Sequence, residues 1–198
     1  MLFDNIMAYD SDFNLHEGMF VGTKGNVIAF ISHKKLDEET YQQYGEVYDG
    51  TGKVLLPGFY NVHAHNIMTM LRGYGEGLPL QRWLNERIFP LEAKLSEENT
   101  YWASMLGIAE MLRFGTVSFS DMYFFPDSRA RSVRDSGIKC NMSQSISCFD
   151  DRAYEELPAY HVVGHMIETY HGCDDRRILV DLAPHSEYLT TEKVLRGI

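Results

Sequence analysis

The sequence predicts an α/β protein whose main sheet is parallel. Two observations support this class. After Pro57, apolar runs with the character of strands alternate with segments of helical periodicity, and before Pro57 short β-like runs are separated by glycines. Strand and helix alternation at this spacing is typical of βαβ units, which place their strands parallel in one sheet. We therefore expect a small β-domain followed by a larger α/β domain.

Residues 1–55 are predicted to form the small domain, which we expect to be β-sandwich-like and incomplete. Short β-like runs occur at 19–21 and 27–31. Glycines punctuate this region, at Gly18, Gly22, Gly25, Gly45, Gly50 and Gly52. Such punctuation is typical of small antiparallel sheets.

The α/β domain is predicted over residues 56–198. Four strands are expected at 58–62, 116–120, 138–145 and 178–182. Helices are expected at 96–114, 126–137 and 153–170, and a further helix opens at 190–198. Strands followed by helices in this order make about four βα units.

The helix at 96–114 carries the clearest local signals. Ser96 can cap its first turn, and Gly115 ends it. Glu97 and Glu98 are acidic residues in the first turn, where they interact favourably with the positive end of the helix dipole. One apolar stripe runs along it, formed by Trp102, Met105, Leu106, Ala109 and Leu112.

Four βα units correspond to half of a (β/α)8 barrel. That fold typically needs about 250 residues, whereas roughly 140 remain after the small domain. The units therefore predict one of two folds. The first is a partial TIM-type barrel, which is the N-terminal half of a complete one. The second is a different and smaller α/β sheet.

The charge balance excludes nucleic acid as a partner. The chain has 18 Lys and Arg against 28 Asp and Glu, a formal net charge of −10, whereas a phosphate-binding surface needs a surplus of cations. No apolar stretch approaches the roughly 20 residues that span a bilayer, and the acidic N-terminus does not have the pattern of a signal peptide. We expect a cytoplasmic protein without membrane contact.

The most informative motif is His63-Ala64-His65 at the end of the first predicted strand of the barrel. Residues two apart in a strand point to the same side, so both imidazoles could bind one metal ion. With 8 histidines in the chain, a pair at this spacing is also expected by chance at about 0.3 per chain, and a pair of surface or core histidines is the alternative.

The surrounding sequence resembles the amidohydrolase superfamily, above all its aminohydrolase branch. The resemblance covers nearly the whole chain, and its landmarks fall in family order. They are Gly25-Asn26-Val27-Ile28, the run from Gly52 to His65 that includes Pro57-Gly58-Phe59, Met70-Leu71-Arg72-Gly73, Trp83-Leu84, Pro90-Leu91-Glu92, Gly115-Thr116-Val117, Asp121-Met122-Tyr123 and Ala183-Pro184-His185-Ser186-Glu187-Tyr188.

The resemblance implies roles for individual residues. His63 and His65 match two metal ligands, Glu92 matches an acidic residue that binds sugar hydroxyls, and His185 matches a substrate-binding histidine. Glu92 could instead be a solvated residue at a helix end. Asp121 ends the second strand, where a catalytic role is conceivable, but the matching residue of the family is better explained as structural.

The resemblance also implies a reaction. It is closest to deaminases of methylthioadenosine and S-adenosylhomocysteine, which hydrolyse a purine nucleoside-like substrate with a metal-activated water. The metal expected is Zn²⁺, with Fe²⁺ as the alternative. The third strand has Gln144 where the adenosine-type enzymes carry an arginine, so a guanine, cytosine or triazine ring stays an alternative substrate.

The catalytic residues of the family, with the remaining metal ligands, are expected after residue 198. Two histidines alone should bind the metal weakly, and the chain alone should have little or no deaminase activity. A half barrel also leaves two unpaired strand edges, which self-association or a complementary C-terminal chain would cover. The alternative to part of a deaminase is a non-catalytic truncated remnant or interaction module.

One further histidine pair, His161 and His165, has the i, i+4 spacing of a zinc chelate. Position 162 is valine, whereas a zinc protease helix has its general base there. We therefore expect these two to be ordinary helix histidines.

Overall fold

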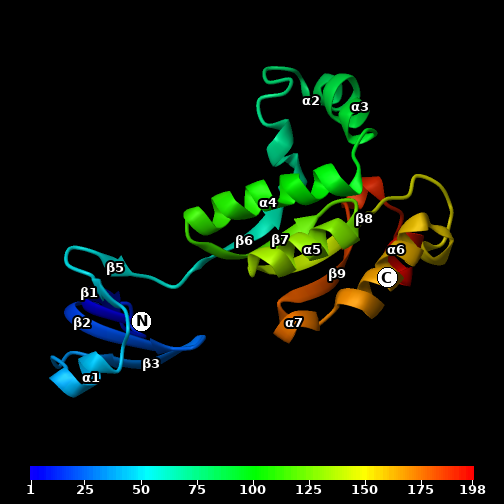
Figure 1. The fold of residues 1–198 in the computed structure, drawn as a ribbon. Coiled ribbons are helices and arrows are strands. Elements are labelled where there is room, and N and C mark those ends of the chain that lie inside the picture. Colours follow the sequence, from blue (N-terminus) through cyan, green and yellow to red (C-terminus); the bar gives the residue numbers. More distant parts are fainter. The chain divides into compact units, whose positions relative to one another are not determined.

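The chain divides between Pro57 and Gly58 in the computed structural model, which describes all 198 residues. The two units are Met1–Pro57 and Gly58–Ile198. Each has its own sheet and its own buried apolar cluster (Figure 1). The α/β class predicted from the sequence is confirmed.

The first unit is built on one mixed sheet of five strands. Its order is β3-β2-β1-β4, and β5 also pairs with β1. Its elements are β1 (Leu2–Tyr9), β2 (Leu15–Lys24), β3 (Val27–Ser32), α1 (Glu38–Gln42), β4 (Val47–Asp49) and β5 (Val54–Leu55). A cluster of Ile6, Ala8, Met19 and Val21 forms its core.

The antiparallel pairing expected in this unit is found in only part of its sheet. Strands β1, β2 and β3 pair antiparallel, but β4 and β5 run parallel to β1. A parallel partner needs a connection that returns the chain to its starting end, and the segment containing α1 provides it. All strands of this unit lie in one sheet. The second sheet that a β-sandwich requires is therefore still only predicted.

The second unit contains a four-stranded sheet in the order β6-β7-β8-β9, with every pair parallel. Its strands are β6 (Phe59–Ala64), β7 (Thr116–Met122), β8 (Lys139–Ile146) and β9 (Ile178–Pro184). Its helical elements are η1 (Asn66–Leu71), α2 (Leu80–Trp83), η2 (Leu84–Ile88), α3 (Phe89–Glu92), α4 (Glu97–Arg113), α5 (Pro126–Ser136), η3 (Tyr154–Glu156), α6 (Pro158–Tyr170), α7 (Cys173–Arg176), η4 (Glu187–Leu189) and α8 (Glu192–Gly197). The outer strands β6 and β9 each have one unpaired edge.

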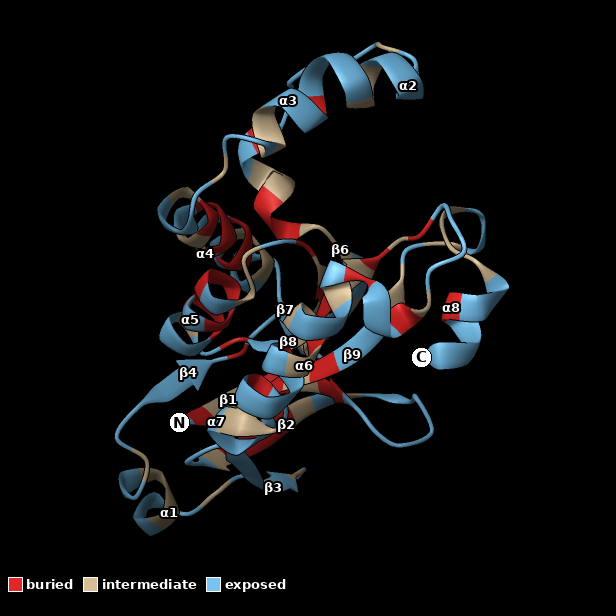
Figure 2. Cartoon of the chain, turned by 90° about the vertical axis from the view of Figure 1, so that its right-hand side faces the viewer, coloured by how far each residue is buried: buried red, intermediate tan, exposed pale blue.

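The helices α4, α5 and α6 cover one face of this sheet (Figure 1). Alternate strand residues meet them in a single apolar cluster, which includes Phe119, Cys140, Met142 and Val180. In Figure 2 the buried residues of α4 and α5 form one side of each helix, whereas α2 and α3 contain no buried residue. None of the helices has the length and apolar character that crossing a membrane requires.

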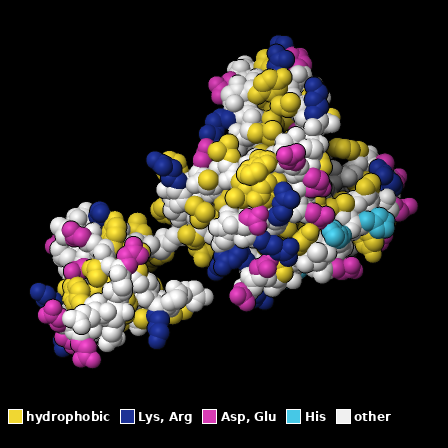
Figure 3. Space-filling view, viewed as in Figure 1, with side chains coloured by type: hydrophobic (Ala, Val, Ile, Leu, Met, Phe, Trp, Pro, Cys, Tyr) yellow, Lys and Arg dark blue, Asp and Glu magenta, His cyan; other side chains and the backbone are white.

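Helix α4 begins as the sequence predicts but buries a different face. Ser96 caps it in a capping box with Asn99, and the backbone turns at Gly115 with φ +85°. The predicted stripe is largely exposed, with Trp102 at 62% and Leu106 at 50%, and Figure 3 shows apolar side chains on the surface over α4. The buried side carries small residues, namely Thr100, Ala103, Ser104 and Gly107, together with Ile108. Small side chains allow η1 to approach the helix closely.

Proline and glycine set the ends of the next helices. Helix α5 begins at Pro126 and ends before Gly137, whose left-handed φ of +75° suits glycine. The helix predicted at 153–170 is broken: η3 ends at Glu156, and α6 begins at Pro158. Proline has no N–H to continue a helix but fits its first turn, so it starts a new one.

The close packing of α4 on η1 leads to a first prediction. A Cβ added to Gly107 would lie 2.0 Å from the buried Asn66 Oδ1, whereas a Cβ at Gly164 of α6 meets nothing within 4 Å. We expect Gly164→Ala to stabilise the protein by about 0.5–1 kcal/mol, because alanine favours a helix over glycine. Gly107→Ala should instead lose on the order of 1–2 kcal/mol, since relieving the clash shifts buried groups. Urea unfolding of both variants checks this, and equal effects at the two sites would contradict the packing described.

Candidate metal centre

The two histidines of the motif lie at a register shift in β6, with His63 inside the shift and His65 after it. Between Asn61 and Ala64, strand β6 advances by three residues while its partner β7 advances by two. An extra residue of this kind is a β-bulge, which redirects the side chains that follow it. After the bulge Ala64 is paired with Asp121, so His63 and His65 project on the other side of the strand.

The imidazole rings of His63 and His65 lie close together. Their centroids are 5.0 Å apart, with an angle of 82° between the ring planes. The Nδ1 atom of His65 is 2.8 Å from the carbonyl oxygen of Met122 on β7. A carbonyl oxygen only accepts hydrogen bonds, so this contact places the proton on Nδ1 and leaves the Nε2 lone pair of His65 available to a metal.

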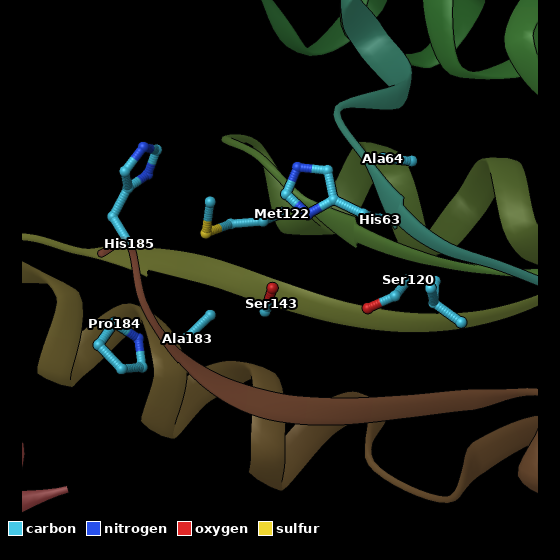
Figure 4. Close-up of a pocket in the computed structure, with 9 residues that line it drawn as sticks. His63, Ala64, Ser120, Met122, Ser143, Ala183, Pro184 and His185 are labelled. Carbon is cyan, nitrogen blue, oxygen red and sulfur yellow. The ribbon is translucent and has the colours of Figure 1, made fainter. Parts of the chain in front are cut away.

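A cavity of about 190 Å³ lies at the carboxyl ends of the four strands. His63 of β6 and His185, which follows β9, reach into it from opposite sides, with Met122 between them (Figure 4). Ser120 of β7 and Ser143 of β8 line its floor. The cavity therefore draws on all four parallel strands, as expected for a site at the carboxyl edge of such a sheet.

His185 is held by the neighbouring strand β8. Its backbone N–H donates to the carbonyl of Ile146 at 3.0 Å, and its Nδ1 lies 3.2 Å from Ser145 Oγ. Burial lowers the pKa of His185 below its ordinary value, and the nearby His65 and His63 rings lower it further. A neutral imidazole can donate one hydrogen bond and accept another.

Glu92 lies at the end of α3 and is bonded to Tyr123. The Tyr123 hydroxyl donates to Oε1 of Glu92, which leaves the second carboxylate oxygen for other donors. Burial and the Glu92 carboxylate raise the pKa of Tyr123 well above its ordinary value, so the phenol stays protonated. The ring centroid of Tyr123 is 6.4 Å from that of His65, so Tyr123 lies between Glu92 and the histidine pair.

Asp121 is fully engaged in structural contacts. It is 2% exposed and pairs with the equally buried Arg129 at 3.0 Å. Its other oxygen accepts the backbone N–H of Asn66 at 2.7 Å. These contacts agree with the structural role favoured for Asp121 from the sequence.

Other residues singled out in the sequence lie away from the cavity. Strand alternation places Gln144 on the face opposite Ser143 and Ser145. On α6, His165 bonds the Asp127 carboxylate at 2.9 Å, and the Tyr170 hydroxyl donates to the same oxygen at 2.8 Å. This cluster ties α6 to α5 and accounts for His165 without a metal.

His63, which lines the cavity, and the adjacent His65, which is not among its lining residues, fit part of a zinc site. The chain brings no group of three His, Cys, Asp or Glu side chains into metal-binding proximity. The close pair His63 and His65 nevertheless offers two imidazole nitrogens, which are donors that zinc favours. The contact of His65 with a carbonyl oxygen is typical of ligating histidines, whose second nitrogen is held by a neighbouring acceptor.

Several residues around the cavity were missed from the sequence. Ser143 and Ser145 could have been found, because the alternation of β8 separates them from the buried Met142 and Ile146. Arg129 gives no local signal: it lies within a helix rich in charge, and only the fold shows that it is buried against Asp121.

The chain is similar to known proteins in sequence and in fold. The sequence profile described as "Amidohydrolase family" matches residues 54–198. A 5-methylthioadenosine/S-adenosylhomocysteine deaminase of Dictyoglomus turgidum is 36% identical over all of this chain and 45% of its own length. A 5'-deoxyadenosine deaminase of Methanothermobacter thermautotrophicus is 44% identical over 76% of this chain and 35% of its own length.

A solved structure shares the fold. The adenosine deaminase of Xanthomonas campestris with bound zinc superimposes with a TM-score of 0.77 and 26% sequence identity, over 96% of this chain and 44% of its own length. This chain thus spans less than half the length of each of these three proteins. Because the family profile covers most of its residues, the chain belongs to the amidohydrolase family.

Proposed function

We propose that this chain supplies the first half of the active site of a metal-dependent aminohydrolase. The substrate proposed is a purine nucleoside of the methylthioadenosine or S-adenosylhomocysteine type, from which water displaces ammonia. One observation carries the proposal: His63 packs ring to ring with His65 and lines a cavity with His185 at the carboxyl ends of parallel strands. The relatives named as adenosine-type deaminases support the substrate class.

His63 and His65 would hold a divalent cation, Zn²⁺ or Fe²⁺. When bound, such a cation acts as a Lewis acid that activates water for hydrolysis. The chain's own part is to fix the donors: the Met122 carbonyl would keep the proton of His65 on Nδ1, which would leave the Nε2 lone pair to bind the ion. His185, held neutral by its lowered pKa, would bond the purine ring or the departing amino group.

Glu92 would select nucleosides over free bases. A carboxylate oxygen accepts hydrogen bonds from neighbouring sugar hydroxyls, and one oxygen of Glu92 is not used by Tyr123. Tyr123 restrains the carboxylate from the side of the histidines. Tyr123 would thus contact both the residue that recognises the sugar, Glu92, and the metal ligand His65.

We further propose that the parallel sheet is the first half of a (β/α)8 barrel, preceded by a small β-domain. The free edges of β6 and β9 would pair with the strands of a second half. That half would bring the remaining metal ligands and the group that transfers protons. Without it the chain should bind metal weakly and turn over little substrate.

The absence of a third ligand from this chain favours a second candidate, a non-catalytic interaction module. Complementation separates the two candidates. The purified chain is assayed for ammonia release from 5'-deoxyadenosine and methylthioadenosine with Zn²⁺, alone and with the C-terminal segment of the Dictyoglomus turgidum relative that lies beyond the matched region. We expect no turnover alone and measurable turnover in the mixture. No turnover in an assembled mixture would favour the interaction module.

The same mixture tests the role of Glu92. Glu92→Gln should raise the KM for nucleosides by roughly 10-fold or more, the effect of losing a hydrogen bond to a charged group. It should leave deamination of the free base adenine unchanged. Glu86→Gln is the control, because Glu86 lies in the preceding helix η2 and is exposed on the surface, where it pairs with Arg82. An equal effect on nucleoside and base would remove Glu92 from sugar recognition.

A further inference from the structure

A buried polar network lies directly behind the proposed metal ligand His65. Its centre is the ion pair of Asp121 on β7 and Arg129 on α5, both 2% exposed and 3.0 Å apart. Each oxygen of the Asp121 carboxylate has a different partner: Oδ2 accepts from Arg129, and Oδ1 accepts from the backbone N–H of Asn66 at 2.7 Å. Asn66 is the residue that follows His65.

Strand β7 therefore holds His65 at two points. Asp121 fixes the backbone immediately after His65, and the next residue, Met122, accepts a hydrogen bond from the His65 ring at 2.8 Å. The two contacts come from consecutive residues of one strand. Any movement of Asp121 would carry the carbonyl of Met122 with it, and so would change the orientation of the imidazole.

Arg129 in turn fixes β7 against β8. Its guanidinium donates to the Asp121 carbonyl at 3.2 Å and to the Ser143 carbonyl at 3.0 Å, besides the carboxylate. Ser143 lines the cavity. One buried cation thus connects the carboxyl ends of two strands that form the floor of the site.

The Asn66 side chain completes the attachment on the side of α4. Its Nδ2 donates to the Ser104 carbonyl at 3.0 Å, and its Oδ1 occupies the space that the absent Cβ of Gly107 leaves. The turn after His65 is thus held by both β7 and α4.

The buried pair of Asp121 and Arg129 is not needed for stability alone. Apolar residues could fill this interior at equal or better stability, because burying an ion pair costs desolvation free energy. What apolar residues could not supply is the set of hydrogen bonds that Asp121 and Arg129 make to the backbone of Asn66, Asp121 and Ser143.

We propose that Asp121 and Arg129 are positioning residues for the metal ligand His65. Arg129 orients the Asp121 carboxylate, the carboxylate fixes the Asn66 N–H, and β7 thereby presents the Met122 carbonyl to His65 Nδ1. The inference rests on the proposed metal site, and it assigns these two residues a role in metal affinity beyond that in folding.

Two matched double variants test it. Asp121→Asn/Arg129→Met removes both charges but keeps an oxygen that accepts from Asn66, whereas Asp121→Leu/Arg129→Met removes the charges and the acceptor at similar volume. Zinc affinity is measured by titration calorimetry, and the tautomer of His65 by long-range ¹H–¹⁵N NMR without metal. We expect the Asn variant to bind Zn²⁺ within about 3-fold of the unaltered chain, and the Leu variant to bind roughly 10–100-fold more weakly with loss of the Nδ1–H tautomer. Equal affinity and equal tautomer in the two variants would overturn the proposal.

A measurement on the unaltered chain covers the case in which the Leu variant does not fold. During zinc titration, the signals of the Asn66 amide and the Arg129 Nε–H should shift together with the His65 ring, while the Arg134 Nε–H of the same helix stays in place. Unchanged Asn66 and Arg129 signals would overturn the proposal. Failure of the metal site itself would be recognised separately, because His65→Ala would then leave zinc binding unchanged.

Discussion

Replacing Arg129 with Met is expected to lower the free energy of unfolding by about 3–5 kcal/mol, or roughly 6–20 °C in Tm for a chain of this size. The reason is the carboxylate that remains. Asp121 is 2% exposed, and without Arg129 its charge would be buried beside only one N–H donor, from Asn66. Loss of one partner of a buried pair is costly for this reason, whereas loss of both is often close to neutral.

The control lies on the same helix. Arg134 pairs with Asp174 at 2.6 Å, but the two side chains are 42% and 41% exposed, so Arg134→Met should cost no more than about 1 kcal/mol. Guanidinium unfolding of both variants, with Asp121→Leu/Arg129→Met as a third, gives the comparison. The double variant should recover most of the stability that Arg129→Met loses. Equal losses in Arg129→Met and Arg134→Met would show that the buried pair does not have the energetic role described.

Removal of either histidine of the motif should reduce zinc affinity by at least about 100-fold. A four-ligand zinc site gains roughly 10–16 kcal/mol, or about 3 kcal/mol per ligand, and 1.4 kcal/mol corresponds to a factor of ten. His63→Ala and His65→Ala are therefore expected to abolish measurable binding of an already weak site. In the complemented enzyme they should also abolish ammonia release.

The matched control for these variants is His161→Ala. His161 is exposed on α6 and does not line the cavity, so its removal should leave zinc affinity unchanged. Titration calorimetry of the three variants decides the assignment. Zinc binding that survives in His63→Ala and His65→Ala but is lost in His161→Ala would move the site to the helix.

The parts of the fold that the sequence predicts are those with local signals. Ser96 and Gly115 mark the ends of α4, and Pro126 and Gly137 mark those of α5, because capping and left-handed turns depend on single residue types. The motif histidines could be placed at a strand end because they directly follow the strand-like run at 58–62. His63 and His185 line one cavity because the strands are parallel, an order that the alternation of strands and helices indicates.

The parts that the sequence does not predict depend on tertiary contacts. The apolar stripe of α4 suggested a buried face with Trp102, but the face that is buried packs on η1, where Asn66 requires the small Gly107 against it. The bulge in β6 redirects His63 and His65, and no residue type in the strand encodes it. Arg129 is a further case, since a charged helix residue is usually exposed and its burial depends on Asp121 of the preceding strand β7.

The measurement that tests the account most directly is anomalous diffraction at the zinc edge from crystals of the chain soaked in Zn²⁺. We predict one anomalous peak in the cavity, with His65 Nε2 and a ring nitrogen of His63 at the roughly 2.0–2.1 Å typical of zinc–imidazole bonds. A peak elsewhere, or a cavity in which the two rings turn away from a common point, would contradict the assignment of these histidines to a single metal ion.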